Sequence, residues 1–188
     1  MAPHKPNKST MKSLLAPIFA TTLCTSSCAY VGWDTMRTPV NFQASEFNSV
    51  ASKYYDRPTS AEIVRFKSGD SYLAIQMDKY GNDVNEIRFV KEGGKEYDQL
   101  IEKYLEWESQ AKANKDLINK DIGKAKGFAN KIKFSIYSAN QYSHYLELSV
   151  FGTSHQYYDR AAALELRKLL NEYTNDKIEF IVKEDTYK

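Results

Sequence analysis

Histidines are the first side chains to consider for chemistry, because imidazole changes its charge near neutral pH and also binds metals. The chain has three of them, His4, His144 and His155. His155 and Asp159 are four residues apart, a spacing that brings two side chains together on one turn of a helix. Asp159 also suits a helix N-cap, and a metal would need further ligands that the sequence does not mark. An exported ligand-binding protein or an enzyme, with a pocket near His144 and His155, is kept as an alternative function.

Other patterns with chemical meaning are incomplete. Residues 152–156 resemble a serine nucleophile elbow that lacks its final glycine. Residues 78–86 are rich in carboxylates and amides, but Gly81 is the fourth residue of this segment, whereas a calcium-binding loop has its glycine sixth. The sequence contains no glycine-rich phosphate loop and no dinucleotide fingerprint. We therefore expect a non-enzymatic protein with no catalytic residues, no metal and no cofactor.

Tyrosine is the most unusual component, with 14 residues in the chain. Tyrosine combines a large contact area with a polar tip and recurs at binding surfaces. Pairing across strands, which stabilises a sheet, explains the same enrichment. With that alternative kept open, we expect a surface for a protein or glycan partner at the tyrosines in or beside the second predicted hairpin: Tyr137, Tyr142, Tyr145, Tyr157 and Tyr158.

The N-terminus has the composition of a targeting segment. Residues 1–27 contain three lysines and no acidic residue, and an apolar run over 14–23 is followed by small residues up to Ala29. A basic start, an apolar stretch of about ten residues and a small-residue end are typical of a secretory signal peptide. The run is about half of the roughly 20 residues that a membrane-spanning helix needs. The sequence therefore predicts export, from a start at Met1 or at Met11.

Ser26 and Ser27 precede Cys28, and small residues before a cysteine resemble the lipobox of bacterial lipoproteins. Thr25 departs from the pattern, because the family usually has leucine there. The resemblance covers only the first 28 or so residues. It implies cleavage before Cys28, a diacylglyceryl group on its thiol and an acyl chain such as palmitate on its amino group. Ala29, in place of the aspartate that favours inner-membrane retention, implies the outer membrane of a Gram-negative host. There we expect the domain on the periplasmic face rather than on the cell surface. Plain secretion and an uncleaved N-terminus are the alternatives.

The charge of the exported part differs from that of the whole chain. The chain has 26 basic and 24 acidic residues, a net charge of +2. Removing residues 1–27 takes away three lysines and leaves 23 basic against 24 acidic residues, a net charge of −1 with neutral histidines. A near-neutral domain gives no electrostatic reason to expect a nucleic-acid partner.

The first part of the exported chain has little strand alternation. We expect residues 28–60 to be a lipid-anchored tether. Within it Phe47, Val50, Ala51 and Tyr54 lie at positions i, i+3, i+4 and i+7, the spacing of one helical face. The sequence therefore predicts a short helix inside the tether.

From residue 61 onward the sequence alternates between strand and helix patterns. Turn residues separate three predicted strands, and a long helix is expected from Lys95 to about Ile122. Two more strands, a helix capped by Asp159 and a last strand follow. The predicted strands cover 63–67, 72–77, 84–90, 132–136, 146–150 and 178–182.

These elements predict an α+β domain over residues 61–188, with an antiparallel sheet of about five to six strands and one long and one shorter helix packed on one face. Similar segments in its two halves fit a degenerate ββ(β)α duplication, although ordinary strand composition also explains them. We expect a lipoprotein that acts as a binding or accessory module in the cell envelope, with an envelope protein as partner. A self-associating structural subunit is a further alternative.

Overall fold

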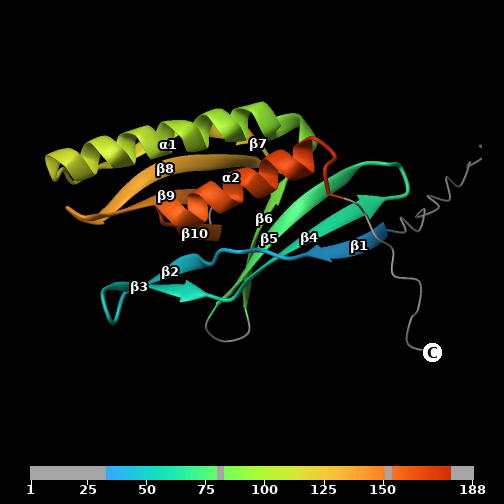
Figure 1. Cartoon of the computed structure of the whole chain (residues 1–188). Coiled ribbons are helices and arrows are strands. Elements are labelled where there is room, and N and C mark those ends of the chain that lie inside the picture. Colours follow the sequence, from blue (N-terminus) through green and yellow to red (C-terminus); the bar gives the residue numbers. More distant parts are fainter. Residues whose placement is uncertain (1–32, 80–82, 151–153, 179–188) are drawn as a thin grey trace, which may run out of the picture. The chain divides into compact units, whose positions relative to one another are not determined.

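The computed structural model describes residues 33–79, 83–150 and 154–178 (Figure 1). Antiparallel strands and two α-helices of unequal length make up this part of the chain, which confirms the predicted α+β class. The elements are β1 (Trp33–Thr38), β2 (Ala44–Asn48), β3 (Lys53–Arg57), β4 (Thr59–Phe66), β5 (Ser71–Asp78), β6 (Val84–Phe89), the 3-10 turn η1 (Lys91–Gly93), α1 (Gly94–Asn114), β7 (Asn119–Lys126), β8 (Lys131–Asn140), β9 (Ser143–Val150), β10 (Ser154–Tyr158) and α2 (Arg160–Thr174).

The strands form two sheets. A four-stranded sheet has the order β1-β4-β5-β6, and a six-stranded sheet has the order β3-β2-β10-β9-β8-β7. A backbone bridge between Phe89 and Gly127 joins the end of β6 to the β7–β8 turn. The core is continuous across both sheets, because buried side chains of β4, β5 and β6 belong to the same cluster as those of β8 and β9.

One long hairpin carries the chain from the first sheet into the second. Thr38 pairs with Ala61 in the four-stranded sheet, and Ala44 pairs with Arg57 in the six-stranded sheet. Pro58 lies at the transition and has no N–H for a ladder. The strands of this hairpin occupy most of residues 33–66, so the expected tether over 28–60 is wrong for the part that the structure describes.

The expected short helix around residues 47–54 is also wrong, because this segment is the turn of that hairpin. Phe47 and Tyr54 are direct cross-strand partners. The Asn48 side chain accepts hydrogen bonds from the backbone N–H groups of Val50, at 3.0 Å, and Ala51, at 2.9 Å. A separation of seven residues suits a helical face and equally suits a pair of residues across a short hairpin.

Helix α1 begins near the predicted residue but ends earlier than Ile122. Lys115 follows its last turn in the left-handed conformation, with φ of 60°, and this geometry terminates a helix. Ile122 is buried as part of β7, which pairs with β8. Ile122, the last apolar residue of the predicted helix, therefore belongs to a strand.

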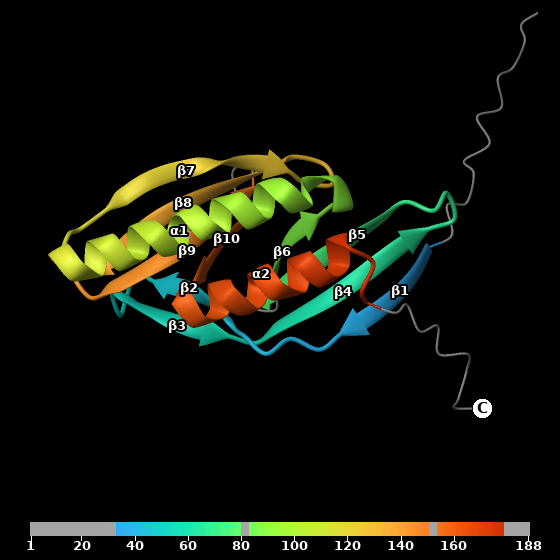
Figure 2. The same cartoon turned by 45° about the horizontal axis from the view of Figure 1, so that its top comes forward.

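The two helices cover the same side of the six-stranded sheet (Figures 1 and 2). α1 packs on β7, β8 and β9, and α2 packs beside α1 on β9 and β10. Every second residue of β8 and β9 is buried against them, as the alternation predicted: Ile132, Phe134, Ile136, Leu146 and Leu148. Residues on the other side of these strands point away from the helices.

Two further observations concern the ends and the membrane. The predicted strand over 178–182 lies outside the described residues except for Ile178. In the described ranges, neither helix combines the length and the apolar character required to cross a bilayer.

Candidate functional site

Five aromatic side chains gather on the side of the six-stranded sheet that faces away from the helices. They come from five strands: Phe47 on β2, Tyr54 on β3, Tyr137 on β8, Tyr145 on β9 and Tyr157 on β10. We call this group the tyrosine surface. Phe47 is 43% exposed and the four tyrosines are half-buried. The sheet therefore presents a contiguous aromatic area to solvent.

Tyr54 is the centre of the tyrosine surface. Its ring stacks on Tyr145 with 4.5 Å between ring centroids and meets Tyr157 edge-on at 5.0 Å. Phe47 lies at 5.1 Å and Tyr137 at 6.0 Å from it. Sequence reasoning omitted Tyr54, because it is far along the chain from the other tyrosines. The signal that could have found it is the hairpin around residues 48–52, which brings β3 beside β2.

The hydroxyl groups of Tyr54 and Tyr157 on the tyrosine surface stay protonated through the neutral range. Burial, reinforced by Tyr137 and Tyr157, raises the pKa of Tyr54 above its ordinary value. Burial followed by the charge of Glu147 raises the pKa of Tyr157 to about 12. The Tyr157 hydroxyl donates to Glu147 Oε1 at 3.4 Å. The surface therefore offers neutral rings with polar tips, which suit an interface that is partly apolar and partly hydrogen-bonded.

The structure separates the five tyrosines that the sequence grouped. Tyr137, Tyr145 and Tyr157 lie together on the tyrosine surface. Tyr142 is 61% exposed in the β8–β9 turn, outside the ring contacts of that surface. Tyr158 is fully buried on the inner side of β10 and donates a hydrogen bond to Gln156 Oε1. Three of the five predicted residues therefore remain candidates for contact with a partner, and Tyr158 belongs to the core.

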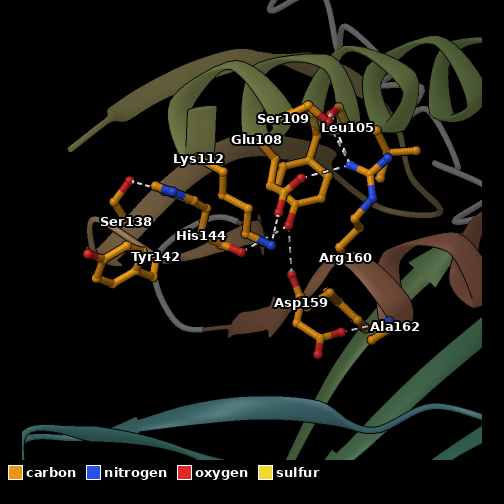
Figure 3. Close-up of polar contacts among 12 residues, drawn as sticks. Leu105, Glu108, Ser109, Lys112, Ser138, Tyr142, His144, Asp159, Arg160 and Ala162 are labelled. Atoms are coloured by element: carbon orange, nitrogen blue, oxygen red, sulfur yellow. Dashed lines mark hydrogen bonds and ion pairs between the residues drawn. The ribbon is translucent and has the colours of Figure 1, made fainter. Parts of the chain in front are cut away.

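His144 belongs to a different place, a polar network between α1, β9 and the start of α2 (Figure 3). It is 3% exposed, and its Nδ1 hydrogen bonds with Ser138 Oγ at 2.6 Å. Burial lowers the pKa of His144. The Tyr104 hydroxyl donates to the backbone oxygen of His144 at 3.1 Å. His144 is thus held as an uncharged side chain inside the fold.

Glu108 of α1 is the charged centre of this network and is 1% exposed. Arg160 Nη1 donates to Glu108 Oε2 at 2.7 Å, and Lys112 forms an ion pair with the other carboxylate oxygen. Arg160 also donates to the backbone oxygen of Leu105, at 3.1 Å. A single guanidinium therefore joins the first residue of α2 to the last turns of α1. An open pocket of about 450 Å³ lies beside the network.

His155 does not share that pocket with His144. It lies in β10 on the outer side of the sheet, and its Nδ1 donates to Glu147 Oε1 at 2.7 Å. The expected pairing with Asp159 on a helical turn is wrong, because a strand holds His155. Asp159 itself caps α2, as predicted, and accepts a hydrogen bond from the N–H of Ala162 at 2.8 Å. The two histidines therefore form no common catalytic or ligand site.

Several residues that the sequence singled out for chemistry lie wholly or partly outside the described ranges. Cys28 lies outside the described residues, as do 152 and 153 of the elbow-like segment and 80–82 of the carboxylate-rich one. The described ends of that carboxylate-rich segment belong to the β5–β6 hairpin. Within 33–79, 83–150 and 154–178, no group of three or more histidine, cysteine, aspartate or glutamate side chains is placed to hold a metal ion.

Comparison of the chain with protein-family models, with curated proteins and with solved structures gave no match in any of the three.

Proposed function

We propose that this protein is a lipid-anchored module of the bacterial cell envelope that binds a protein partner through the tyrosine surface, without catalysis. The observation that carries the proposal is the group of five aromatic side chains around Tyr54 on the solvent side of the six-stranded sheet. The lipobox-like segment before Cys28 supports the membrane anchor.

Three properties of the tyrosine surface favour protein recognition. Tyrosine is enriched among the few interface residues that dominate binding energy. Hydrogen-bonded strands hold the rings, and ring-to-ring contacts fix them further, so binding orders few side chains. The neutral hydroxyls supply hydrogen-bond donors at the edge of an apolar area. A preformed, partly apolar face of this kind suits a flat partner surface better than a small molecule.

The anchor is tested by Cys28→Ala, with Cys24→Ala as the matched control. We expect Cys28→Ala to abolish metabolic labelling with palmitate and to move the protein from the membrane pellet to the soluble fraction, because two or three acyl chains hold a protein firmly on a bilayer. Cys24→Ala should remain labelled and membrane-bound. Retention of label and of membrane attachment by Cys28→Ala would exclude the lipoprotein assignment.

The binding role is tested by photocrosslinking in cells. Benzoylphenylalanine in place of Phe47 should give one dominant adduct of defined mass, identified by mass spectrometry as a second envelope protein. The same group in place of Leu164, which is 44% exposed on α2, should not give that adduct. An adduct with a second copy of this chain would establish the self-association alternative, and equal adducts from both positions would contradict a role for the tyrosine surface.

Tyr54→Ala is expected to lower the yield of that adduct at least about tenfold, because loss of a central aromatic anchor commonly costs about 2 kcal/mol or more of binding energy. Tyr54→Phe keeps the ring and should stay within about twofold of the wild type. Tyr142→Ala, outside the surface, should leave the yield unchanged. Thermal melting of each variant shows whether the fold is retained, and a folded Tyr54→Ala with a normal yield would exclude Tyr54 as the centre of the interface.

A further inference from the structure

A second feature on the outer side of the six-stranded sheet is a pocket of about 310 Å³ that three lysines help to line. Lys124 of β7 and Lys131 and Lys133 of β8 line it, together with His155 of β10 and Asn130 of the β7–β8 turn. We call it the lysine pocket. Ser149 and Val150 of β9 complete the lining, so the pocket draws its residues from four strands and one turn. The sheet register rather than a single segment therefore places the positive charges together.

The β7–β8 ladder sets lysine opposite lysine at two positions. Lys124 pairs with Lys133, and Lys126 pairs with Lys131. Like charges directly opposite each other in a ladder destabilise it. Two such pairs in succession are unfavourable unless an anion lies close by. A negatively charged group bound at the pocket would reduce this repulsion.

The acidic residues of the protein neutralise only part of this charge. Lys133 pairs with Asp121 at 2.7 Å, and Lys126 lies 3.7 Å from Glu92. Glu147 is engaged by His155. Lys131 forms no ion pair with any residue that the structure describes, and neither does Lys124. The three lysines that line the pocket therefore outnumber the two carboxylates, Asp121 and Glu147, that pair with its lining residues.

We propose that the lysine pocket binds a phosphate group, carried either by a soluble phosphorylated compound or by a phospholipid headgroup. Several lysines around one small cavity match a compact oxyanion such as a phosphate group, for which each lysine acts as a point charge. His155 lines the same cavity, with its Nδ1 hydrogen-bonded to Glu147 Oε1.

The proposal is tested with the full chain in detergent micelles, using inorganic phosphate as the probe and lysine labelling read by mass spectrometry. Phosphate should slow labelling of Lys124, Lys131 and Lys133 but not of Lys168, an exposed lysine on α2. Lys131→Gln should weaken phosphate binding about fivefold, and the double variant with Lys133→Gln about 25-fold, the size expected for charged hydrogen bonds at a partly exposed site. Lys168→Gln should leave binding unchanged.

A vesicle arm separates the two sources of the phosphate group. The full chain is placed in phosphatidylcholine vesicles with and without phosphatidylglycerol. Protection of the pocket lysines that depends on phosphatidylglycerol assigns the headgroup, and protection by free phosphate alone assigns a soluble ligand. Absence of protection in both arms overturns the proposal. Equal weakening by Lys168→Gln shows an adventitious ion only and overturns it as well.

Discussion

Gln156→Leu is expected to lower the free energy of unfolding by about 3–4 kcal/mol. Gln156 is fully buried, and its side-chain amide donates to the backbone oxygens of Ile75, at 3.1 Å, and Asn85, at 3.0 Å. Its carbonyl oxygen accepts from the Tyr158 hydroxyl. Leucine has a similar size but no polar atoms, so three buried polar groups would lose a partner, each at a cost of about 1 kcal/mol or more.

The effect follows from the position of Gln156 between the two sheets. It belongs to β10 of the six-stranded sheet, whereas Ile75 and Asn85 belong to β5 and β6 of the other sheet. A further hydrogen bond joins the same two strands, β6 and β10: the Asn85 side chain donates to the backbone oxygen of His155 at 2.8 Å. Polar bonds across an otherwise apolar core thus fix how β10 meets the four-stranded sheet, which apolar packing alone specifies less strictly.

Urea denaturation followed by circular dichroism measures this change. Tyr158→Phe removes only the hydroxyl bond and should lower the free energy of unfolding by about 1 kcal/mol. Ser149→Ala, on the outer side of β9, should be neutral to within about 0.5 kcal/mol. If Gln156→Leu is as stable as Ser149→Ala, the amide does not join the sheets in the way described.

Arg160→Leu is expected to lower the free energy of unfolding by about 2–3 kcal/mol. The substitution removes one of the two cations that face the buried Glu108 carboxylate and also a donor to the backbone oxygen of Leu105. Removal of one partner from a buried ion pair is strongly destabilising because a charge is left incompletely compensated. Arg160 is partly exposed, so the expected loss is smaller than for a fully buried pair.

A double-mutant cycle separates the charge from the packing. Glu108→Gln in the Arg160→Leu background removes the carboxylate that lost its partner, so the double variant should be at least about 1 kcal/mol more stable than the sum of the two single changes predicts. Lys168→Leu serves as the control for loss of an exposed cation on α2 and should change stability by less than about 0.5 kcal/mol. Additive effects of Glu108→Gln and Arg160→Leu would show that the pair contributes no coupling.

Short-range sequence patterns predicted the strands and the helix of the second half of the chain best. Alternating apolar residues in β8 and β9 identified the buried side of the sheet, and Asp159 marked the start of α2 through its own side chain. Both signals depend on neighbours in the sequence. Strand order depends on contacts far along the chain, so the sequence predicted one sheet of five or six strands where the structure has two.

The first half shows why spacing can mislead. Phe47 and Tyr54 fit a helical face, but Asn48 caps a turn between them and Ser52 adopts a positive φ of 53°, so the chain reverses there. The same reversal places Tyr54 at the centre of the tyrosine surface. Sequence reasoning therefore found Tyr137, Tyr145 and Tyr157 of this surface and omitted the residue that joins them.

On the proposed lipid anchor at Cys28, the early start of β1 limits how far the domain can lie from a bilayer. Trp33 opens β1 five residues after Cys28, and a fully extended chain advances at most about 3.6 Å per residue, so the first strand stays within about 18 Å of a lipid-modified Cys28. A flexible tether over 28–60 would instead reach about 110 Å. So short a connection to the proposed anchor would keep the domain in a thin layer beside the membrane and raise its effective concentration toward molecules in that layer. The proposed partner is therefore expected to be embedded in the same membrane or to lie against it.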